Sequence, residues 1–141
     1  AHTLDERGQE AGLVTHGFIG PEKGIDELTT ATVNHVQGVG RQREVRALWR
    51  AEDFGLNSAP ITELQGGDLT ANLATVEAIL AGRGPAGLVD TIVLNSAVAL
   101  HLTGRVSTIR EGLAPARELL LGGAVQAKIK ATKEFYHTSQ T

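Results

Sequence analysis

The stretch LVDTIVLNSAVALHL, residues 88–102, decides the fold class of this chain. Apolar residues lie on nearly every side of a helix drawn over it, and such a helix is normally buried between other elements. Asn95, Ser96 and His101 interrupt the run, which stays short of the roughly 18 apolar residues that a membrane-spanning helix needs. The sequence therefore predicts a buried central helix and no membrane association.

Three further helices are predicted around the central one, because apolar residues recur there at helical spacing. They cover residues 69–80, residues 107–121 and residues 124–136. Asp68 precedes the first of them and is well placed to accept backbone N–H bonds as its N-cap. In the last and most polar helix, we expect these side chains to face inward: Val125, Ile129, Thr132, Phe135 and Tyr136.

The first third of the chain is expected to be rich in β-structure, because its β-branched residues alternate with polar ones between glycine-containing turns. The expected elements are a helix end over residues 1–8, a strand over residues 11–16 that Gly17 ends, a loop over residues 18–24, and a β-hairpin of residues 29–36 and 41–50 around Gly38-Val39-Gly40. The hairpin is expected to keep one face in solvent. The predicted architecture is α/β or α+β: a short strand plus a β-hairpin, followed by several helices.

The expected strands are too few to cover the apolar faces of so many helices. We therefore expect residues 1–141 to be a partial α/β domain of a larger folded body, completed either by further sequence or by another chain. The first residue is Ala1 rather than Met, which fits both a removed initiator and a piece cut from a longer chain.

Composition excludes several classes of function. The 141 residues carry a formal net charge of −3 and include no cysteine. Disulfide frameworks, thiol catalysis and thiolate metal sites are therefore excluded, and the absence of cysteine fits a reducing compartment without establishing one. With thirteen basic residues against sixteen acidic ones, the chain has no basic field for non-specific nucleic-acid binding.

The acidic pair Asp26-Glu27, after a glycine-containing loop, is the most suggestive candidate for chemistry. Hard cations such as Mg²⁺ take one or two protein carboxylates and complete their shell with water and phosphate oxygens. A loop can direct neighbouring carboxylates at one such ion. On the pattern alone, an acidic loop in solvent is the commoner meaning of such a pair.

The other candidates favour structural roles. His16 follows strand-like residues, where it could serve as a general acid or base, but a histidine bonded to backbone at a strand end is the simpler interpretation. Gly66-Gly67-Asp68 is better explained as a turn and N-cap than as a phosphate site, because the aspartate already occupies the positive end of the helix dipole. Asn95 is interpreted as a satisfied buried amide. The histidines show no ligand spacing, and no catalytic or cofactor-binding residue is assigned to this chain.

Six segments together resemble a known family. They are Leu13-Val14-Thr15-His16-Gly17, Gly24-Ile25-Asp26-Glu27-Leu28-Thr29-Thr30, Glu52-Asp53-Phe54-Gly55-Leu56, Gly66-Gly67-Asp68 with Asn72, Val93-Leu94-Asn95-Ser96-Ala97 and Glu111-Gly112. In this order and spacing the chain resembles the C-terminal portion of the anthranilate phosphoribosyltransferases, over nearly its whole length. The resemblance implies a phosphoribosyltransferase/nucleoside-phosphorylase-like α/β domain.

The resemblance also implies a function. Members of this family transfer phosphoribosyl from phosphoribosyl pyrophosphate to the amine of anthranilate in tryptophan biosynthesis, in the cytoplasm and commonly as homodimers. Carried over to this sequence, the family's metal site falls on Asp26 and Glu27, which are expected to bind the Mg²⁺ that meets the pyrophosphate. A metal that neutralises the leaving group suits such a reaction.

The sequence departs from the family pattern in two ways. The family's N-terminal helical domain, its Gly-Thr-Gly-Gly-Asp loop, its Lys-His-Gly-Asn segment and its anthranilate-binding arginine have no counterpart here. We therefore expect the chain to be inactive alone. Residues 18–23 also lengthen the loop before Asp26.

Two alternatives stay open. One is a non-enzymatic relative that binds nucleic acid through the hairpin arginines Arg41, Arg43, Arg46 and Arg50, although Glu44 interrupts them and the net charge argues against it. The other is a ligand-free interaction domain.

Overall fold

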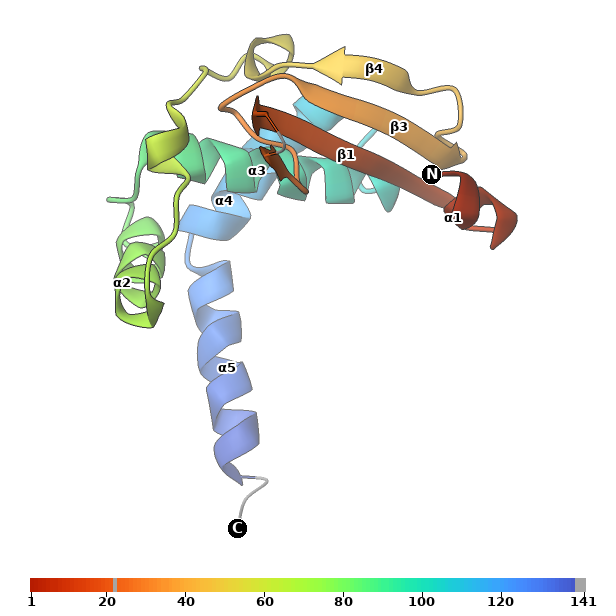
Figure 1. Cartoon of the computed structure of the whole chain (residues 1–141). Helices are drawn as coiled ribbons and strands as arrows, with labels where there is room; N and C mark the ends of the chain where they lie inside the picture. The colour runs from red at the N-terminus through yellow and green to blue at the C-terminus, as the bar shows by residue number, and fades with distance from the viewer. Residues whose placement is uncertain (22, 139–141) are drawn as a thin grey trace.

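The computed structural model describes residues 1–21 and 23–138. Its four strands are β1 (Ala11–Gly20), β2 (Lys23–Ile25), β3 (Asn34–Gly40) and β4 (Arg46–Trp49). Its helices are α1 (His2–Glu6), α2 (Leu69–Leu80), α3 (Ala86–Leu102), α4 (Ile109–Leu121) and α5 (Ala124–Thr138), with the short 3₁₀ helices η1 (Ala51–Phe54) and η2 (Ile61–Glu63). The strands form one antiparallel sheet in the order β2-β1-β3-β4, and helices α3 and α4 lie on one of its faces (Figure 1). The predicted mixed α/β architecture is confirmed.

The predicted burial of the central helix is confirmed as well. Helix α3 runs beneath the strands (Figure 1) and takes part in two apolar clusters. Leu94 packs with Leu28 and Val36 on the side of the sheet, while Val93 packs with Ile79 of α2 and Leu120 of α4. Each fully buried Leu or Val side chain stabilises the fold by roughly 1.5–3 kcal/mol. Because α3 contributes to both clusters, it joins the sheet layer to the helical layer.

The strand at residues 11–16 is longer than predicted. It continues through Gly17 to Gly20 and returns as β2, where a loop was expected; Glu22 lies outside the described residues. Gly17 is buried, and a Cβ there would lie 3.1 Å from Thr29 Cγ2 and 3.3 Å from Thr32 Cγ2. Gly17 therefore does not end the strand. It leaves room for the side chains of Thr29 and Thr32, which lie close to its backbone.

The predicted hairpin is confirmed, but its turn was placed too early. Gly38 and Gly40 belong to β3, and the chain turns over residues 41–44. A Cβ at Gly38 would overlap the carbonyl group of Gln42, and the Gly38 N–H donates to the carbonyl of Val45 at 2.8 Å. The glycine is needed because the turn folds back onto it. The first hairpin strand was also placed too early, because the N–H groups of Thr29 and Thr30 donate to side chains rather than to a neighbouring strand.

The helix starts follow local hydrogen bonding. Asp68 caps α2 as predicted, with Oδ1 accepting from the Ala71 N–H at 2.8 Å. Helix α4 is capped by Thr108, one residue after the predicted start at Ser107, and Thr108 Oγ1 accepts from the Glu111 N–H at 3.2 Å. No helix in the described part of the chain has both the length and the apolarity to span a bilayer.

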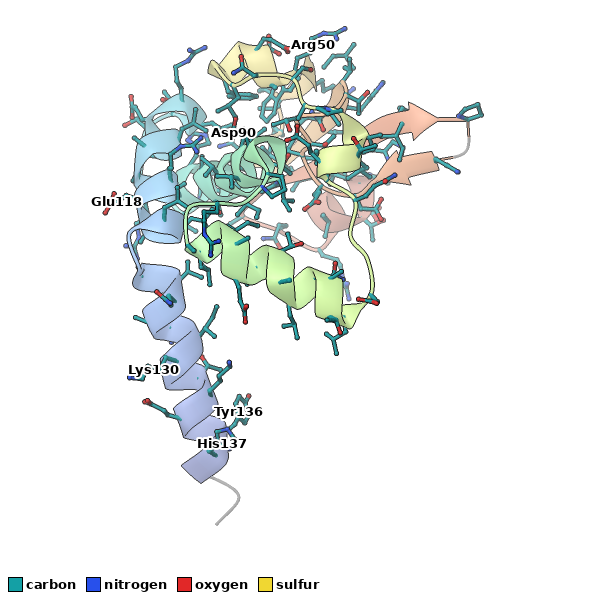
Figure 2. All side chains as sticks on the ribbon, turned by 90° about the vertical axis from the view of Figure 1, so that its left-hand side faces the viewer. Arg50, Asp90, Glu118, Lys130, Tyr136 and His137 are labelled. Atoms are coloured by element: carbon teal, nitrogen blue, oxygen red, sulfur yellow. The ribbon has the colours of Figure 1, made fainter. Side chains whose placement is uncertain are left out.

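Helix α5 contradicts the prediction of an inward apolar face. It projects from the body after Gly122-Gly123 (Figure 1), and Tyr136 and His137 lie near its far end, with Lys130 about halfway along it (Figure 2). Ile129 is 37% exposed and Tyr136 65% exposed. Thr132 and Phe135 are exposed as well, and only Val125 packs against the core. The spacing defined an apolar stripe correctly, but the outer part of that stripe is exposed.

Candidate metal-binding site

Asp26 and Glu27 lie between an exposed strand and a buried segment. They follow β2, which ends at Ile25, and they precede Leu28, which is 1% exposed. Both acidic residues are exposed. Their carboxylates are therefore accessible to solvent, while the chain directly after them is part of the core.

The amide of Asn95 holds the residue that follows the pair. Asn95 Oδ1 accepts from the Leu28 N–H at 3.2 Å, and Asn95 Nδ2 donates to the Leu28 carbonyl at 2.7 Å. The same Nδ2 donates to the Thr91 carbonyl at 2.9 Å, one turn earlier in α3. Asn95 is thus a satisfied amide, as predicted, and it fixes both backbone groups of Leu28 to the central helix.

Two further polar groups hold the next two residues. The Thr30 N–H donates to Thr91 Oγ1 at 3.2 Å, and Thr30 Oγ1 donates to the Gly87 carbonyl at 3.2 Å. Thr29 forms a closed pair with Asn34: its N–H donates to Asn34 Oδ1 at 2.8 Å, and its carbonyl accepts from Asn34 Nδ2 at 2.9 Å. Residues 28–30 are therefore held by α3 and by the start of β3.

Before the pair, the chain is held by the β1–β2 hairpin. Gly17 pairs with Ile25 and Phe18 with Gly24, and the register shifts between Phe18 and Gly20. His16 lies inside β1 rather than at a strand end, which corrects the sequence-based interpretation. Its ring makes an edge contact with the ring of Phe18, with 4.5 Å between centroids.

The residues present fit a hard cation that takes only one or two of its ligands from the protein. Asp26 and Glu27 supply carboxylate oxygens, which Mg²⁺ prefers, and Mg²⁺ is usually held by one or two carboxylates with water and phosphate oxygens. Within residues 1–21 and 23–138, no group of three or more His, Cys, Asp or Glu side chains could hold a metal ion. A site at this pair would therefore depend on ligands from water or substrate.

The remaining sequence candidates have structural partners. Asn72 Oδ1 accepts from the Gly67 N–H at 2.8 Å and its Nδ2 donates to the Gly67 carbonyl at 3.0 Å, so the Gly66-Gly67-Asp68 segment is a turn and cap as predicted. In the hairpin, Arg41 pairs with Glu10 at 3.4 Å, and Arg43 Nε donates to the Gly40 carbonyl at 3.2 Å.

The outer face of the sheet carries a shallow hollow that does not include the acidic pair. Its volume is about 500 Å³, and it is lined by residues of β1, β3 and β4, among them His16, His35, Arg46 and Leu48. The hollow is therefore separate from the candidate metal site.

The family model described as "Glycosyl transferase family, a/b domain" matches residues 1–126. The chain belongs to this glycosyl transferase family. All four strands and helices α1 to α4 lie within the matched residues. Both flanks of the Asp26-Glu27 pair are thus parts of the family's a/b domain.

Curated anthranilate phosphoribosyltransferases are similar to this glycosyl transferase family member. The one from Deinococcus radiodurans is 34% identical over 123 residues, covering 87% of this chain and 35% of the relative. The one from Roseiflexus castenholzii is 38% identical over 131 residues, covering 92% of this chain and 37% of the relative. The solved anthranilate phosphoribosyltransferase from Thermus thermophilus has a TM-score of 0.70 at 33% identity, covering 84% of this chain and 33% of that chain. The resemblance inferred from the motifs is confirmed, and the chain spans little more than a third of the length of these curated relatives.

Sequence reasoning missed three of the anchoring residues: Thr30, Asn34 and Thr91. One signal could have revealed Thr91, because it lies four residues before Asn95 on the same face of an otherwise apolar helix. Polar groups repeated at that spacing must find partners when buried. Asn34 carried no comparable signal, because its partners come from a loop and from β4.

Proposed function

We propose that this chain is the C-terminal portion of an anthranilate phosphoribosyltransferase. In that role it supplies the Mg²⁺-binding pair Asp26 and Glu27 to a reaction that transfers phosphoribosyl from phosphoribosyl pyrophosphate to anthranilate. The observation that carries the proposal is the exposed acidic pair on a fixed support, in a chain similar to these enzymes over most of its length. We also propose that the complete enzyme is cytoplasmic and homodimeric.

When bound, Mg²⁺ supplies positive charge that stabilises the departing pyrophosphate. The protein's contribution is to hold the carboxylates where they need little reorganisation. The bonds from Asn95 to Leu28 and from Thr91 to Thr30 do this on the C-terminal side of the pair. A preorganised charge is worth more in catalysis than one that must be ordered during the reaction.

A chimaeric enzyme tests the proposal. Residues 1–126 would replace the matching third of the Deinococcus radiodurans relative, and loss of anthranilate fluorescence would be followed with phosphoribosyl pyrophosphate and Mg²⁺. We expect turnover by the chimaera and none by the isolated chain. Asp26→Asn and Glu27→Gln should each lower kcat/KM by about a hundredfold, the scale for loss of one charge-stabilising group.

Glu44→Gln is the matched control, because Glu44 is an exposed acid in the turn between β3 and β4, at the other end of β1 from the pair. It should leave turnover unchanged. A folded chimaera whose activity is the same with and without the Asp26 and Glu27 carboxylates would contradict the proposed metal site. Turnover by the isolated chain would contradict its assignment as an incomplete enzyme.

A further inference from the structure

The imidazole of His16 lies against Gly24, two residues before Asp26. A Cβ built at Gly24 would overlap the Cε1 edge of the His16 ring, 2.1 Å from Cε1, 2.7 Å from Nε2 and 3.1 Å from Nδ1. Since Phe18 is the register partner of Gly24, the imidazole reaches diagonally across from β1 to β2. A side chain of any size at position 24 would displace it.

Phe18 holds the imidazole from another direction. The two rings meet edge to face, with centroids 4.5 Å apart and an interplanar angle of 82°. Phe18 also meets His35 of β3, with centroids 5.3 Å apart. Such edge contacts favour one ring orientation over others, and the contact with Phe18 therefore favours the position of the His16 ring against Gly24.

The support matters because β2 is weak by itself. It has three residues, and its register with β1 shifts between Phe18 and Gly20. A strand this short at a sheet edge is held by few ladder bonds. The contact between His16 and Gly24 is thus a second tie on the N-terminal side of Asp26, matching the bonds of Asn95 to Leu28 on the other side of the pair.

We propose that His16, held by Phe18 and packed on Gly24, is a positioning residue for the Asp26-Glu27 site. We call these three residues the ring clamp. Phe18 belongs to residues 18–23, which lengthen the segment before Asp26. The added segment thus supplies the ring that contacts His16, and this contact offsets the loss of positioning that a longer segment would cause. The inference rests on the proposed function, because it concerns how that function's metal site is held.

The test uses the 141-residue chain and Mn²⁺ as a paramagnetic substitute for Mg²⁺. Line broadening of the Asp26 and Glu27 amides in NMR spectra reports the affinity at the site, without any need for activity. His16→Ala and Gly24→Ala should each weaken the affinity about tenfold, the lower end of the effect of residues that orient metal ligands. Gly20→Ala is the matched control on the same hairpin, because a Cβ at Gly20 has nothing within 4 Å.

Two further variants separate positioning from ligation. His16→Phe keeps a flat ring over Gly24 and should retain most of the affinity. The double variant His16→Ala/Gly24→Ala should bind no more weakly than His16→Ala alone, because the added methyl group then has room. If His16→Phe loses as much affinity as His16→Ala, the imidazole nitrogen is a ligand and the proposal is overturned. It is overturned equally if Gly24→Ala behaves like Gly20→Ala.

Backbone relaxation of residues 24–27 without metal distinguishes this inference from the proposed function. The ring clamp predicts faster motion there in His16→Ala and Gly24→Ala, and no change in Gly20→Ala. If the unmodified chain shows no selective broadening at Asp26 and Glu27 but those motions change as expected, the metal site fails and the ring clamp stands. Unchanged motion in His16→Ala would refute the ring clamp whatever the metal does.

Discussion

Asn34 makes the densest set of hydrogen bonds of a single side chain in the described part of the chain, and it is 1% exposed. Its Oδ1 accepts from the Thr29 N–H, and its Nδ2 donates to the carbonyls of Thr29 and Trp49 at 2.9 Å and 3.2 Å. One amide therefore joins the segment after the acidic pair to the end of β4.

Asn34→Ala should destabilise the fold by roughly 3 kcal/mol, because it leaves several buried backbone groups without partners. Urea denaturation followed by circular dichroism would measure the loss. Asn57→Ala is the control, since Asn57 is exposed, and it should change stability by less than about 0.5 kcal/mol. Equal effects of the two variants would mean that the Asn34 network adds nothing to stability.

Single residues also show what the sequence could predict. The Asp68 cap was predicted correctly because its partner, Ala71, is three residues away and needs no tertiary information. Gly17 and Gly38 were misinterpreted as breaks because the reason for each glycine is a neighbour from elsewhere in the fold. Asp26 and Glu27 were singled out by their residue type and by a family resemblance, and their role in metal binding stays a prediction.

At the scale of elements, the crossing of α3 and α4 depends on a glycine. A Cβ at Gly112 would lie 3.0 Å from both the Cβ and the carbonyl oxygen of Ala97. The two helices thus approach closely at this point. Asp90 of α3 and Arg117 of α4 also form an ion pair between the same two helices.

Gly112→Ala should destabilise the fold by about 1 kcal/mol, because overpacking costs more than the gain in helix propensity. Ala97→Gly should lose stability by itself, but the double variant should lose less than the sum of the two changes, since the contact is relieved. Thermal denaturation of the four proteins completes the cycle. Strict additivity would show that the two positions do not touch.

Helix α5 shows the limit of periodicity as a predictor. The spacing of Val125, Ile129, Thr132 and Tyr136 correctly marks one side of a helix. Whether that side is covered depends on whether another element reaches it, and spacing holds no information on that. Helix α3 was easier to predict, because a helix that is apolar on nearly every side must be buried whatever surrounds it.

At the scale of the whole molecule, some of the exposed apolar side chains lie in groups. Leu69, Leu73 and Val76 form a stripe on α2, with exposed fractions of 74%, 56% and 45%. Phe18 and Leu48 stand out from the outer face of the sheet, at 55% and 60%. Grouped apolar surface of this kind promotes association in water.

We expect the isolated chain to self-associate as its concentration rises. The triple variant Leu69→Gln/Leu73→Gln/Val76→Gln should reduce this association in sedimentation velocity experiments, with little change in stability because all three side chains are exposed. A matched triple variant on the polar side of the same helix, Thr70→Gln/Ala74→Gln/Glu77→Gln, should associate like the original chain. A chain that is monomeric at all concentrations would contradict the expectation.

The edges of the sheet affect the form that such association can take. One edge is β4, with four residues. At the other edge β2 pairs only with residues 17–20 of β1, so no described strand pairs with residues 11–16 of β1 on that side. That stretch offers N–H and C=O groups on which a second chain can add a strand. Association through side-chain surfaces is limited by shape and reverses on dilution, whereas strand addition can continue into fibres. The open edge of β1 therefore gives the isolated chain a route to fibre-like growth.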